Sequence, residues 1–501
     1  MKLPKHYYSW PTFIGGTVAA LSLFLILILL LISTVFGIGD NYAGLFTFII
    51  LPVIMVSGLI LMFLGNFLRI RKKKREQDPD NVKFPIVNFN DPKQRSIFFI
   101  TLSGLAVFTV ISAMGSYQAF HYTESDEFCG LLCHNVMEPE YTAHEGSAHE
   151  RVGCVECHVG AGAGWYIKSK MSGLYQVYSV IAKAYPQPIP TPLENLRPAR
   201  ETCEKCHWPE KFYDRKYISH KHYIADEQNS EWDITMVMKT GPSFRGMGLE
   251  NGIHWHINKD VKIEYASTSF KRDTIVYVKY TNLKTGKVKV YQDEKNPVDE
   301  AQVANLEFRT MDCLDCHNRP SHNYKSPQHF FDDAFTAGEI PNDLPDIKIA
   351  AMDILKNEFP DKDSAFRAIE QGIMGYYEMM YPELLETPTD KAKIDQAIAA
   401  IKDSFSKNVF PFMKVRSNHY PNYLGHIENN GCYRCHNDSF KNEEKEVISR
   451  DCNLCHDIKS QGTPDSLRYA NDKEFLEFEH PVDIKGKWKT KLCAECHAEL
   501  Y

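Results

Sequence analysis

A repeated cysteine pattern constrains this chain more strongly than any other feature. Between Cys129 and His497, two cysteines followed directly by a histidine occur seven times, and these pairs use all 14 cysteines. Six copies have the spacing C-x-x-C-H, whereas the first is one residue wider. In chain order the copies are Cys129/Cys133/His134, Cys154/Cys157/His158, Cys203/Cys206/His207, Cys313/Cys316/His317, Cys432/Cys435/His436, Cys452/Cys455/His456 and Cys493/Cys496/His497.

This spacing is typical of covalent haem attachment, in which two thiols form thioethers to one haem and the next histidine ligates its iron. Zinc sites, disulfides and thioredoxin-like sites also use paired cysteines, but none of them needs a histidine after every pair. With 20 histidines in 501 residues, chance would place one there about 4% of the time. The sequence therefore predicts seven c-type haems, numbered here as sites 1 to 7 in chain order.

Three long apolar runs precede site 1. They cover residues 14–36, 42–68 and 96–120 and contain no charged residue. Each is long enough, as a helix, to cross a hydrocarbon core of about 30 Å. A cleavable signal peptide is the alternative for the first run, but the run is too long and has no small-residue cleavage site. We expect three transmembrane helices.

The distribution of basic residues predicts the orientation of these helices. Residues 69–75 read Arg-Ile-Arg-Lys-Lys-Lys-Arg, and Lys2 and Lys5 precede the first run. Because lysine and arginine are retained on the cytoplasmic side, everything after residue 120 is expected outside, in the periplasm. A basic run can also bind nucleic acid, but between spanning helices it favours the topological interpretation. We expect a protein of the bacterial inner membrane, with its haem domain in the periplasm and no nucleic-acid partner.

The predicted fold is mainly α, with three transmembrane helices followed by a periplasmic multihaem domain that contains a small β-hairpin insert. The hairpin is predicted from residues 274–280 and 288–291 around a Lys-Thr-Gly-Lys turn. Apolar residues at helical spacing predict amphipathic helices within 327–407. The expected regions are 1–120 (membrane), 121–207 (sites 1–3), 208–312 (insert), 313–431 (site 4 and a helical spacer) and 432–501 (sites 5–7).

The remaining histidines provide candidates for the second ligand of each iron. They gather near the attachment sites, and as a set they suit haems with two histidine ligands. The predicted second ligands are His149, His222, His254, His256, His322, His426 and His480, while His144, His220 and His419 lie in the same neighbourhoods. At site 1, Met137 follows His134 by three residues and offers a thioether. Whether Met137 or His134 ligates the iron of site 1 stays open.

One region resembles a known family. Cys129-Gly-Leu-Leu-Cys-His-Asn-Val-Met, Ser147-Ala-His-Glu-Arg-Val-Gly-Cys-Val-Glu-Cys-His-Val-Gly, Trp165-Tyr-Ile-Lys-Ser-Lys-Met-Ser-Gly-Leu-Tyr-Gln-Val-Tyr and Leu196-Arg-Pro-Ala-Arg-Glu-Thr-Cys-Glu-Lys-Cys-His-Trp-Pro resemble the NapC/NirT membrane-anchored quinol dehydrogenases. This resemblance covers about a fifth of the chain. The simplest family members have one membrane helix and four haems. The whole architecture is similar to the seven-haem inner-membrane cytochromes of metal-reducing bacteria.

The resemblance implies that a haem next to the membrane takes electrons from quinol. Site 1 begins nine residues after the third apolar run, which agrees with this expectation. Similar proteins place a lysine and an acidic residue in the segment that here holds Lys168, Lys170 and Gln176, so these three are the candidate catalytic residues. Because the second position is glutamine, the acceptor of the quinol protons stays open. Contact with lipid headgroups is the alternative role for the two lysines.

The predicted function is a menaquinol:cytochrome c oxidoreductase that passes electrons to periplasmic c-type cytochromes in anaerobic or extracellular respiration. A terminal reductase of a small oxyanion is one alternative, and it would need an iron with an open coordination position. An electron-wiring subunit docked on a larger membrane complex is another. The sequence leaves open whether the chain forms a homo-oligomer or needs a partner subunit.

Overall fold

The computed structural model describes residues 10–36, 50–75, 88–96, 98–100, 103–104, 117–118, 121–132, 134–160, 162–193, 196–212, 214–241, 252–471 and 474–498. The chain divides into two compact units. The N-terminal unit is Met1–Glu124 with Val159–Tyr175, and the C-terminal unit is Ser125–His158 with Gln176–Tyr501.

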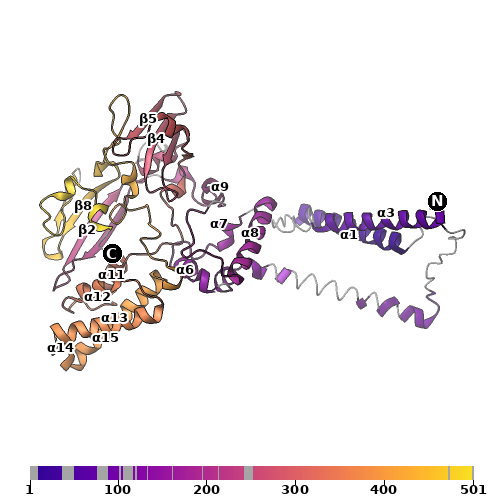
Figure 1. The fold of residues 1–501 in the computed structure, drawn as a ribbon, viewed down its shortest axis with the longest axis horizontal. Helices are drawn as coiled ribbons and strands as arrows, with labels where there is room; N and C mark the ends of the chain where they lie inside the picture. The colour runs from indigo at the N-terminus through magenta and orange to yellow at the C-terminus, as the bar shows by residue number, and fades with distance from the viewer. Residues whose placement is uncertain are drawn as a thin grey trace. The chain divides into compact units, whose positions relative to one another are not determined.

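Two of the three predicted membrane segments are helical in the described residues. They form α1, Trp10–Phe36, and α3, Leu51–Arg75 (Figure 1). In the described part of the chain, only Leu51–Leu68 is a helix long and apolar enough to cross a membrane, and Trp10–Ile26 is a shorter apolar stretch. The third run, 96–120, lies largely outside the described residues. A membrane anchor is therefore supported, and the number of three spanning helices stays a prediction.

Small residues allow α1 and α3 to approach each other closely. A Cβ added at Gly15 would lie 2.5 Å from the carbonyl oxygen of Gly58, and one at Gly65 would lie 2.7 Å from the backbone nitrogen of Thr12. Small residues at such positions let two apolar helices pack backbone against backbone where water provides no driving force. Gly15, Gly58 and Gly65 therefore define the contact between the two helices.

The variant Gly15→Leu is expected to lower the thermal unfolding temperature of the protein in detergent, because its side chain would push α3 away from α1. Such overpacking typically costs about 1–3 kcal/mol. The matched control is Gly16→Leu, since a Cβ at Gly16 meets only the sulfur of Met62, at 3.8 Å. Equal unfolding temperatures for the two variants would contradict this contact.

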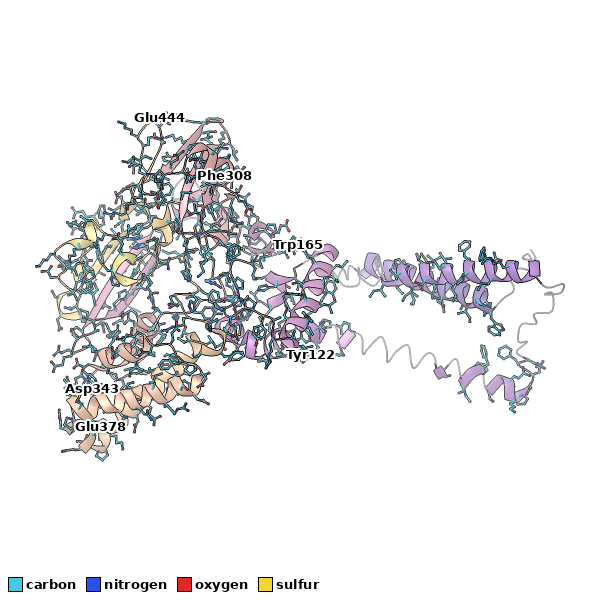
Figure 2. All side chains as sticks on the ribbon, in the orientation of Figure 1. Tyr122, Trp165, Phe308, Asp343, Glu378 and Glu444 are labelled. Atoms are coloured by element: carbon cyan, nitrogen blue, oxygen red, sulfur yellow. The ribbon has the colours of Figure 1, made fainter. Side chains whose placement is uncertain are left out.

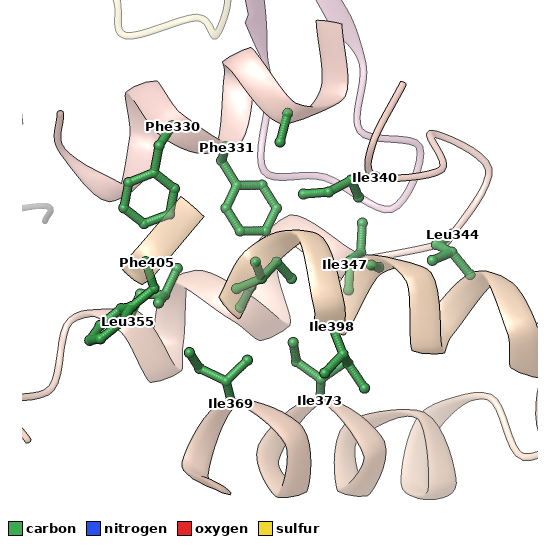
Figure 3. Packing of buried hydrophobic residues seen from close by; sticks show 14 of the residues in the cluster. Phe330, Phe331, Ile340, Leu344, Ile347, Leu355, Ile369, Ile373, Ile398 and Phe405 are labelled. Atoms are coloured by element: carbon green, nitrogen blue, oxygen red, sulfur yellow. The ribbon is translucent and has the colours of Figure 1, made fainter. Parts of the chain in front are cut away.

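A layer of helices forms the largest apolar core of the C-terminal unit. It consists of α11 (Pro327–Thr336), α12 (Ile347–Leu355), α13 (Lys362–Met380), α14 (Glu383–Glu386) and α15 (Pro388–Asn408). Figure 3 shows the side chains of Phe331, Ile369 and Ile373 pointing into the space between these helices, and all three are fully buried. The helical faces predicted from the apolar spacing are confirmed, because Ile347, Ala351, Leu355, Ile394, Ala397 and Ile401 all lie in this core.

Two antiparallel sheets complete the C-terminal unit. The five-stranded sheet has the order β6 (Phe308–Thr310), β3 (Val261–Ser267), β4 (Ile275–Asn282), β5 (Val288–Asp293) and β7 (Phe440–Lys441). The four-stranded sheet has the order β1 (Lys216–Tyr223), β2 (Glu231–Met238), β8 (His456–Gly462) and β9 (Arg468–Tyr469). The predicted hairpin is confirmed as β4 and β5, paired from Tyr277 opposite Gln292 to Thr281 opposite Val288.

Helices predominate over strands, as expected, but the expectation of only a small hairpin insert was too narrow. The protein combines helices with two sheets, and β7, β8 and β9 come from the region of sites 5 to 7. Strand β8 reads His-Asp-Ile-Lys-Ser-Gln-Gly and contains a single aliphatic residue, so its local sequence carries little strand signal. It is a strand because it pairs with β2, where Met238 lies opposite His456.

The remaining elements are mostly short, apart from α6 and α8. The α-helices are α5 (Asp126–Leu131), α6 (His134–Glu145), α7 (Cys154–His158), α9 (Ala199–Cys203), α10 (Glu300–Ala304) and α16 (Ala494–His497), and α8 (Ala163–Ile181) runs from one unit into the other. The 3₁₀ turns are η3 (Pro209–Lys211), η5 (Ile253–Ile257), η6 (Cys313–Asp315), η7 (Pro411–Met413), η8 (Gly431–Arg434), η9 (Cys452–Leu454), η10 (Pro464–Ser466) and η11 (Lys487–Lys489).

Candidate haem sites

Most described attachment motifs fold into a single helical turn, while at site 6 the turn η9 ends at Leu454 and His456 begins strand β8. At site 3 the backbone N–H of His207 donates to the carbonyl of Cys203 at 2.8 Å, and at site 4 His317 donates to Cys313 at 2.8 Å. Sites 5 and 7 have the same bond at 3.0 Å, and site 2 forms the helix α7. This turn brings two thiols and the histidine to one haem-sized neighbourhood, as thioether attachment requires. None of the 13 described cysteines forms a disulfide, so the disulfide interpretation fails for them.

A second histidine ring lies next to the attachment histidine at each of sites 2 to 7. Two imidazoles on opposite sides of one iron should have ring centres about 6 Å apart, since each metal–nitrogen bond is about 2 Å and each ring centre lies about 1 Å beyond its nitrogen. The observed separations of ring centres are 6.2 Å (His158 and His322), 6.0 Å (His207 and His149), 6.3 Å (His317 and His254), 5.9 Å (His436 and His256), 6.2 Å (His456 and His426) and 6.0 Å (His497 and His480).

Hydrogen bonds at Nδ1 orient most of these second histidines. Their acceptors are backbone carbonyls: Pro320 for His149 at 3.0 Å, Thr240 for His254 at 2.8 Å, Ile253 for His256 at 2.8 Å, Glu140 for His322 at 3.0 Å and Val482 for His480 at 2.8 Å. A histidine whose Nδ1–H donates to a carbonyl keeps the lone pair of Nε2 for a metal. These five rings are therefore prepared to ligate through Nε2.

Burial favours the neutral form of several of the paired imidazoles, which is the form that binds a metal. It lowers the pKa of His322 and the pKa of His456 to about 4. It also lowers the pKa values of His158, His256, His317 and other members of the pairs. Since desolvation disfavours the charged form, these five rings are neutral at neutral pH, with one N–H and one free lone pair each. The residues present thus fit a haem iron at each of sites 2 to 7.

The attachment sites contact one another in chain order. The side chain of Cys129 (site 1) hydrogen-bonds Cys154 (site 2), and that of Cys313 (site 4) hydrogen-bonds Cys203 (site 3). Between these pairs, Cys206 (site 3) lies close enough to Cys157 (site 2) to raise its pKa, although burial raises that pKa more. Sites 1 to 4 therefore follow one another as a series in the described residues.

The series continues from site 4 to site 7. Arg434 lies inside the motif of site 5 and donates to the carbonyl of Asp315, inside the motif of site 4, at 2.6 Å. The ring of Tyr433, also in site 5, lies 4.5 Å from the ring of His426, which belongs to site 6. Cys452 (site 6) is a neighbour of Cys493 (site 7), because burial and the thiol of Cys452 both raise the pKa of Cys493.

The sequence alone did not predict roles for Tyr433 and Arg434, because the residues between paired cysteines carry no signal of their own.

A single large cavity connects most of these sites. It has a volume of about 2750 Å³ and is lined by the histidine pairs of sites 3 to 7 and by Cys157 of site 2. A pocket for one drug-sized ligand has about 300–1,000 Å³. The cavity is therefore large enough for several large, closely spaced ligands.

The structure does not bring every predicted ligand to an attachment site. His222 instead approaches the Asp332 carboxylate with its Nδ1, at 3.2 Å, and its ring centre lies 6.0 Å from that of His220. Among the described rings, no attachment histidine pairs with His222. Ligation by His222 therefore stays a prediction without geometric support.

Site 1 is described only in part. Met137 is half-buried on α6, while Cys133 and the side chain of His134 lie outside the described residues. His144 is buried, and its Nε2 has no hydrogen-bond partner in the described part of the chain. One ligand atom each of Asp126, His144 and Cys154 lie within 4.8 Å of one another. The choice between Met137 and His134 stays open.

The three candidate catalytic residues have different surroundings. Lys170 forms an ion pair with Glu124, whose side chain is only 8% exposed, and its ammonium lies 5.1 Å from the centre of the Tyr166 ring. Lys168 is exposed and lies 4.9 Å from the ring of Trp165, which Figure 2 labels. Gln176 is exposed. Glu124 was missed, because the expected acidic residue was sought only in the segment around residue 176.

Comparisons with known proteins agree with these sites. The model of the NapC/NirT cytochrome c family, N-terminal region, matches residues 91–188. Cytochrome c-type protein ImcH of Geobacter sulfurreducens is 40% identical over 496 residues, which are 98% of this chain and 95% of that protein. Cytochrome c-type protein NrfH of Wolinella succinogenes is 30% identical over 117 residues, which are 22% of this chain and 66% of that protein. No solved structure matches the chain.

The two kinds of match cover different parts of the chain. The family model covers residues 91–188, which contain sites 1 and 2, whereas the similarity to ImcH covers nearly the whole chain. Covalent haem and a role in electron transport follow from membership of a cytochrome c family. This chain belongs to the NapC/NirT family of c-type cytochromes, in the long form that ImcH represents.

Proposed function

We propose that this protein is a membrane-anchored quinol dehydrogenase. It takes electrons from menaquinol at the outer face of the bacterial inner membrane and passes them through seven c-type haems to periplasmic c-type cytochromes. Bound haem supplies the one-electron carriers, and the chain supplies their spacing, axial ligands and surroundings. The acceptors place the protein in anaerobic or extracellular respiration.

The six histidine pairs carry this proposal. Two histidines on one iron fill both axial positions, which suits electron transfer and leaves no position for a substrate. A reductase of a small oxyanion would need an open position, and each of the described sites 2 to 7 has a second histidine about 6 Å from the first. The pairs therefore favour an electron relay over that alternative.

The contacts between successive sites support a serial path. Electron transfer requires close redox centres, and each attachment site lies near the next one in the chain. Site 1 follows the third apolar run by nine residues, so chain connectivity keeps it near the end of that run. Electrons from a lipid-soluble donor enter at site 1 and leave at site 7.

Quinol oxidation also releases protons, and Glu124 is our candidate for the acceptor. A general base needs a side chain that is held in position within reach of the substrate's proton. Glu124 meets this condition through Lys170. It also follows the third apolar run by four residues, where a membrane-dissolved quinol is accessible.

The variant Glu124→Gln is expected to slow menaquinol-driven haem reduction about 100-fold, the typical loss when a general base is removed. Reduction by dithionite should be unchanged, because dithionite needs no proton acceptor. The measurement is stopped-flow absorbance of the holoprotein in nanodiscs. The matched control is Glu150→Gln, an exposed glutamate whose side chain is 51% accessible. A wild-type rate in Glu124→Gln would remove Glu124 from the mechanism without affecting the rest of the proposal.

A further inference from the structure

A lysine-rich loop lies next to the last haem site. Residues 485–491 contain Lys485, Lys487, Lys489 and Lys491, all of them exposed, and this segment is called the lysine loop below. It lies in the chain between His480, the second histidine of site 7, and Cys493, the first cysteine of that site. All four lysines line the wall of the large cavity beside His497.

The loop is positively charged on a chain whose formal net charge is −7. Lys489 pairs with Glu477 at 2.6 Å. In the described parts of the chain, no carboxylate pairs with Lys485, Lys487 or Lys491. The nearby carboxylates are engaged with backbone, since Asp483 accepts from the N–H of Lys485 at 2.8 Å and Glu495 from the N–H of Leu492 at 3.0 Å. Lys485, Lys487 and Lys491 are therefore exposed ammonium groups without an ion-pair partner in the described part of the chain.

Site 7 is also where the series of haem sites ends. Its Cys496 is exposed, as is Cys206 of site 3, whereas Cys432, Cys435, Cys452 and Cys455 of the two preceding sites are half-buried. An electron can leave to another protein only where a redox centre comes near the surface. The lysine loop thus lies at site 7, the last haem site of the series.

We propose that the lysine loop is the docking surface at which electrons leave this protein, and that its partner is an electron carrier with an acidic surface around its own redox centre. This inference rests on the proposed function for the direction of electron flow. Complementary charge raises the rate of encounter and orients the partner, and salt weakens both effects. A carrier with a basic surface would be repelled by the same lysines.

The test uses holoprotein that has been reduced with dithionite and freed of excess reductant. Two small oxidants stand in for partners of opposite charge, the hexacyanoferrate(III) anion and the tris(phenanthroline)cobalt(III) cation. Their oxidation rates are measured from about 0.01 M to about 1 M ionic strength, across which the Debye length falls from about 30 Å to about 3 Å. The variant is Lys485→Glu/Lys487→Glu/Lys491→Glu.

In the wild type, oxidation by the anion should slow at least tenfold as salt increases, within the usual range for electrostatic steering of about 10 to 1,000-fold. The loop variant should lose this dependence and react faster with the cation. The control is Lys259→Glu/Lys287→Glu/Lys295→Glu, which makes the same charge change at exposed lysines that do not line the cavity. It should keep the wild-type behaviour.

Two results would overturn the inference. Equal effects of the two triple variants would mean that only net charge matters. A loop variant with altered haem content or potentials but the wild-type salt dependence would mean that the lysines neutralise haem propionates instead. Because the experiment starts from dithionite-reduced protein, its outcome does not depend on quinol oxidation, so the proposed function and this inference fail separately.

Discussion

Replacing His256 with alanine is expected to interrupt the electron path in its middle. His256 is the partner of His436 at site 5, with ring centres 5.9 Å apart, and its Nδ1 is held by the carbonyl of Ile253 at 2.8 Å. Without it, the iron of site 5 loses one axial ligand. Changes around a metal ligand typically cost about 10 to 100-fold in activity, and removal of the ligand itself should cost at least that much.

Two measurements check this expectation. Electron paramagnetic resonance of the oxidised variant should show one high-spin haem per chain, and turnover from a menaquinol analogue to hexacyanoferrate(III) should fall at least about tenfold. His419→Ala is the control, because His419 belongs to none of the six pairs and its Nδ1 bonds to the carbonyl of Lys414 at 2.5 Å. A variant His256→Ala with only low-spin haems would show that His256 is not the ligand.

Replacing Lys348 with methionine is expected to be the most destabilising single change in the helical layer. Lys348 is fully buried, forms an ion pair with Asp332 at 2.5 Å and donates to the carbonyl of Tyr223. Asp332 also accepts from the backbone N–H of Tyr223 at 3.2 Å. The group thus joins α11 and α12 to β1. Removing one partner of a buried ion pair costs about 3–5 kcal/mol, because the other charge is left buried and unpaired.

The pKa of Asp332 gives this stabilisation a defined dependence on pH. Burial alone would raise the pKa of Asp332, but the hydrogen bond from His222 and the charge of Lys348 hold it below its usual range. A carboxyl group with a lowered pKa in the folded state stabilises the protein fully above its unfolded pKa of about 4. The contribution is lost as the pH falls below that value. Wild-type protein should therefore lose stability below about pH 4 in denaturant titrations.

A double variant separates the effect of the unpaired charge from the loss of side-chain packing. Lys348→Met/Asp332→Leu should be less destabilised than Lys348→Met alone, because it removes the unpaired carboxylate. Lys402→Met is the surface control, since Lys402 pairs with Glu370 on an exposed helix face at 2.6 Å and should matter little. Equal stability of Lys348→Met and wild type would show that the buried pair contributes nothing.

The sequence predicted the attachment sites because their chemistry is local. Two cysteines and a histidine within five residues form one helical turn, and nothing distant is needed to recognise them. The second ligands are different. His322 follows site 4 in the chain yet pairs with His158 of site 2, and His149 precedes site 2 yet pairs with His207 of site 3. Six of the seven predicted second ligands lie in such pairs, but only the tertiary structure could match each to its site.

In the fold, too, elements with a local sequence signal were predicted, and those that depend on distant residues were not. The hairpin of β4 and β5 was predicted from alternating residues around a turn, and the helical layer from apolar spacing. Strand β8 could not be predicted, because its polar sequence becomes a strand only through pairing with β2. Glu124 was missed for a similar reason, since its partner Lys170 lies 46 residues away.

The reduction of wild-type holoprotein by menaquinol tests the central claim most directly. Protein in nanodiscs would be mixed anaerobically with a menaquinol analogue, and the reduced haem would be followed by absorbance and compared with the total haem reduced by dithionite. The account predicts that menaquinol alone reduces more than one haem per chain, because electrons pass from site 1 along the series. The account would be contradicted if dithionite reduced the haems and menaquinol reduced none of them.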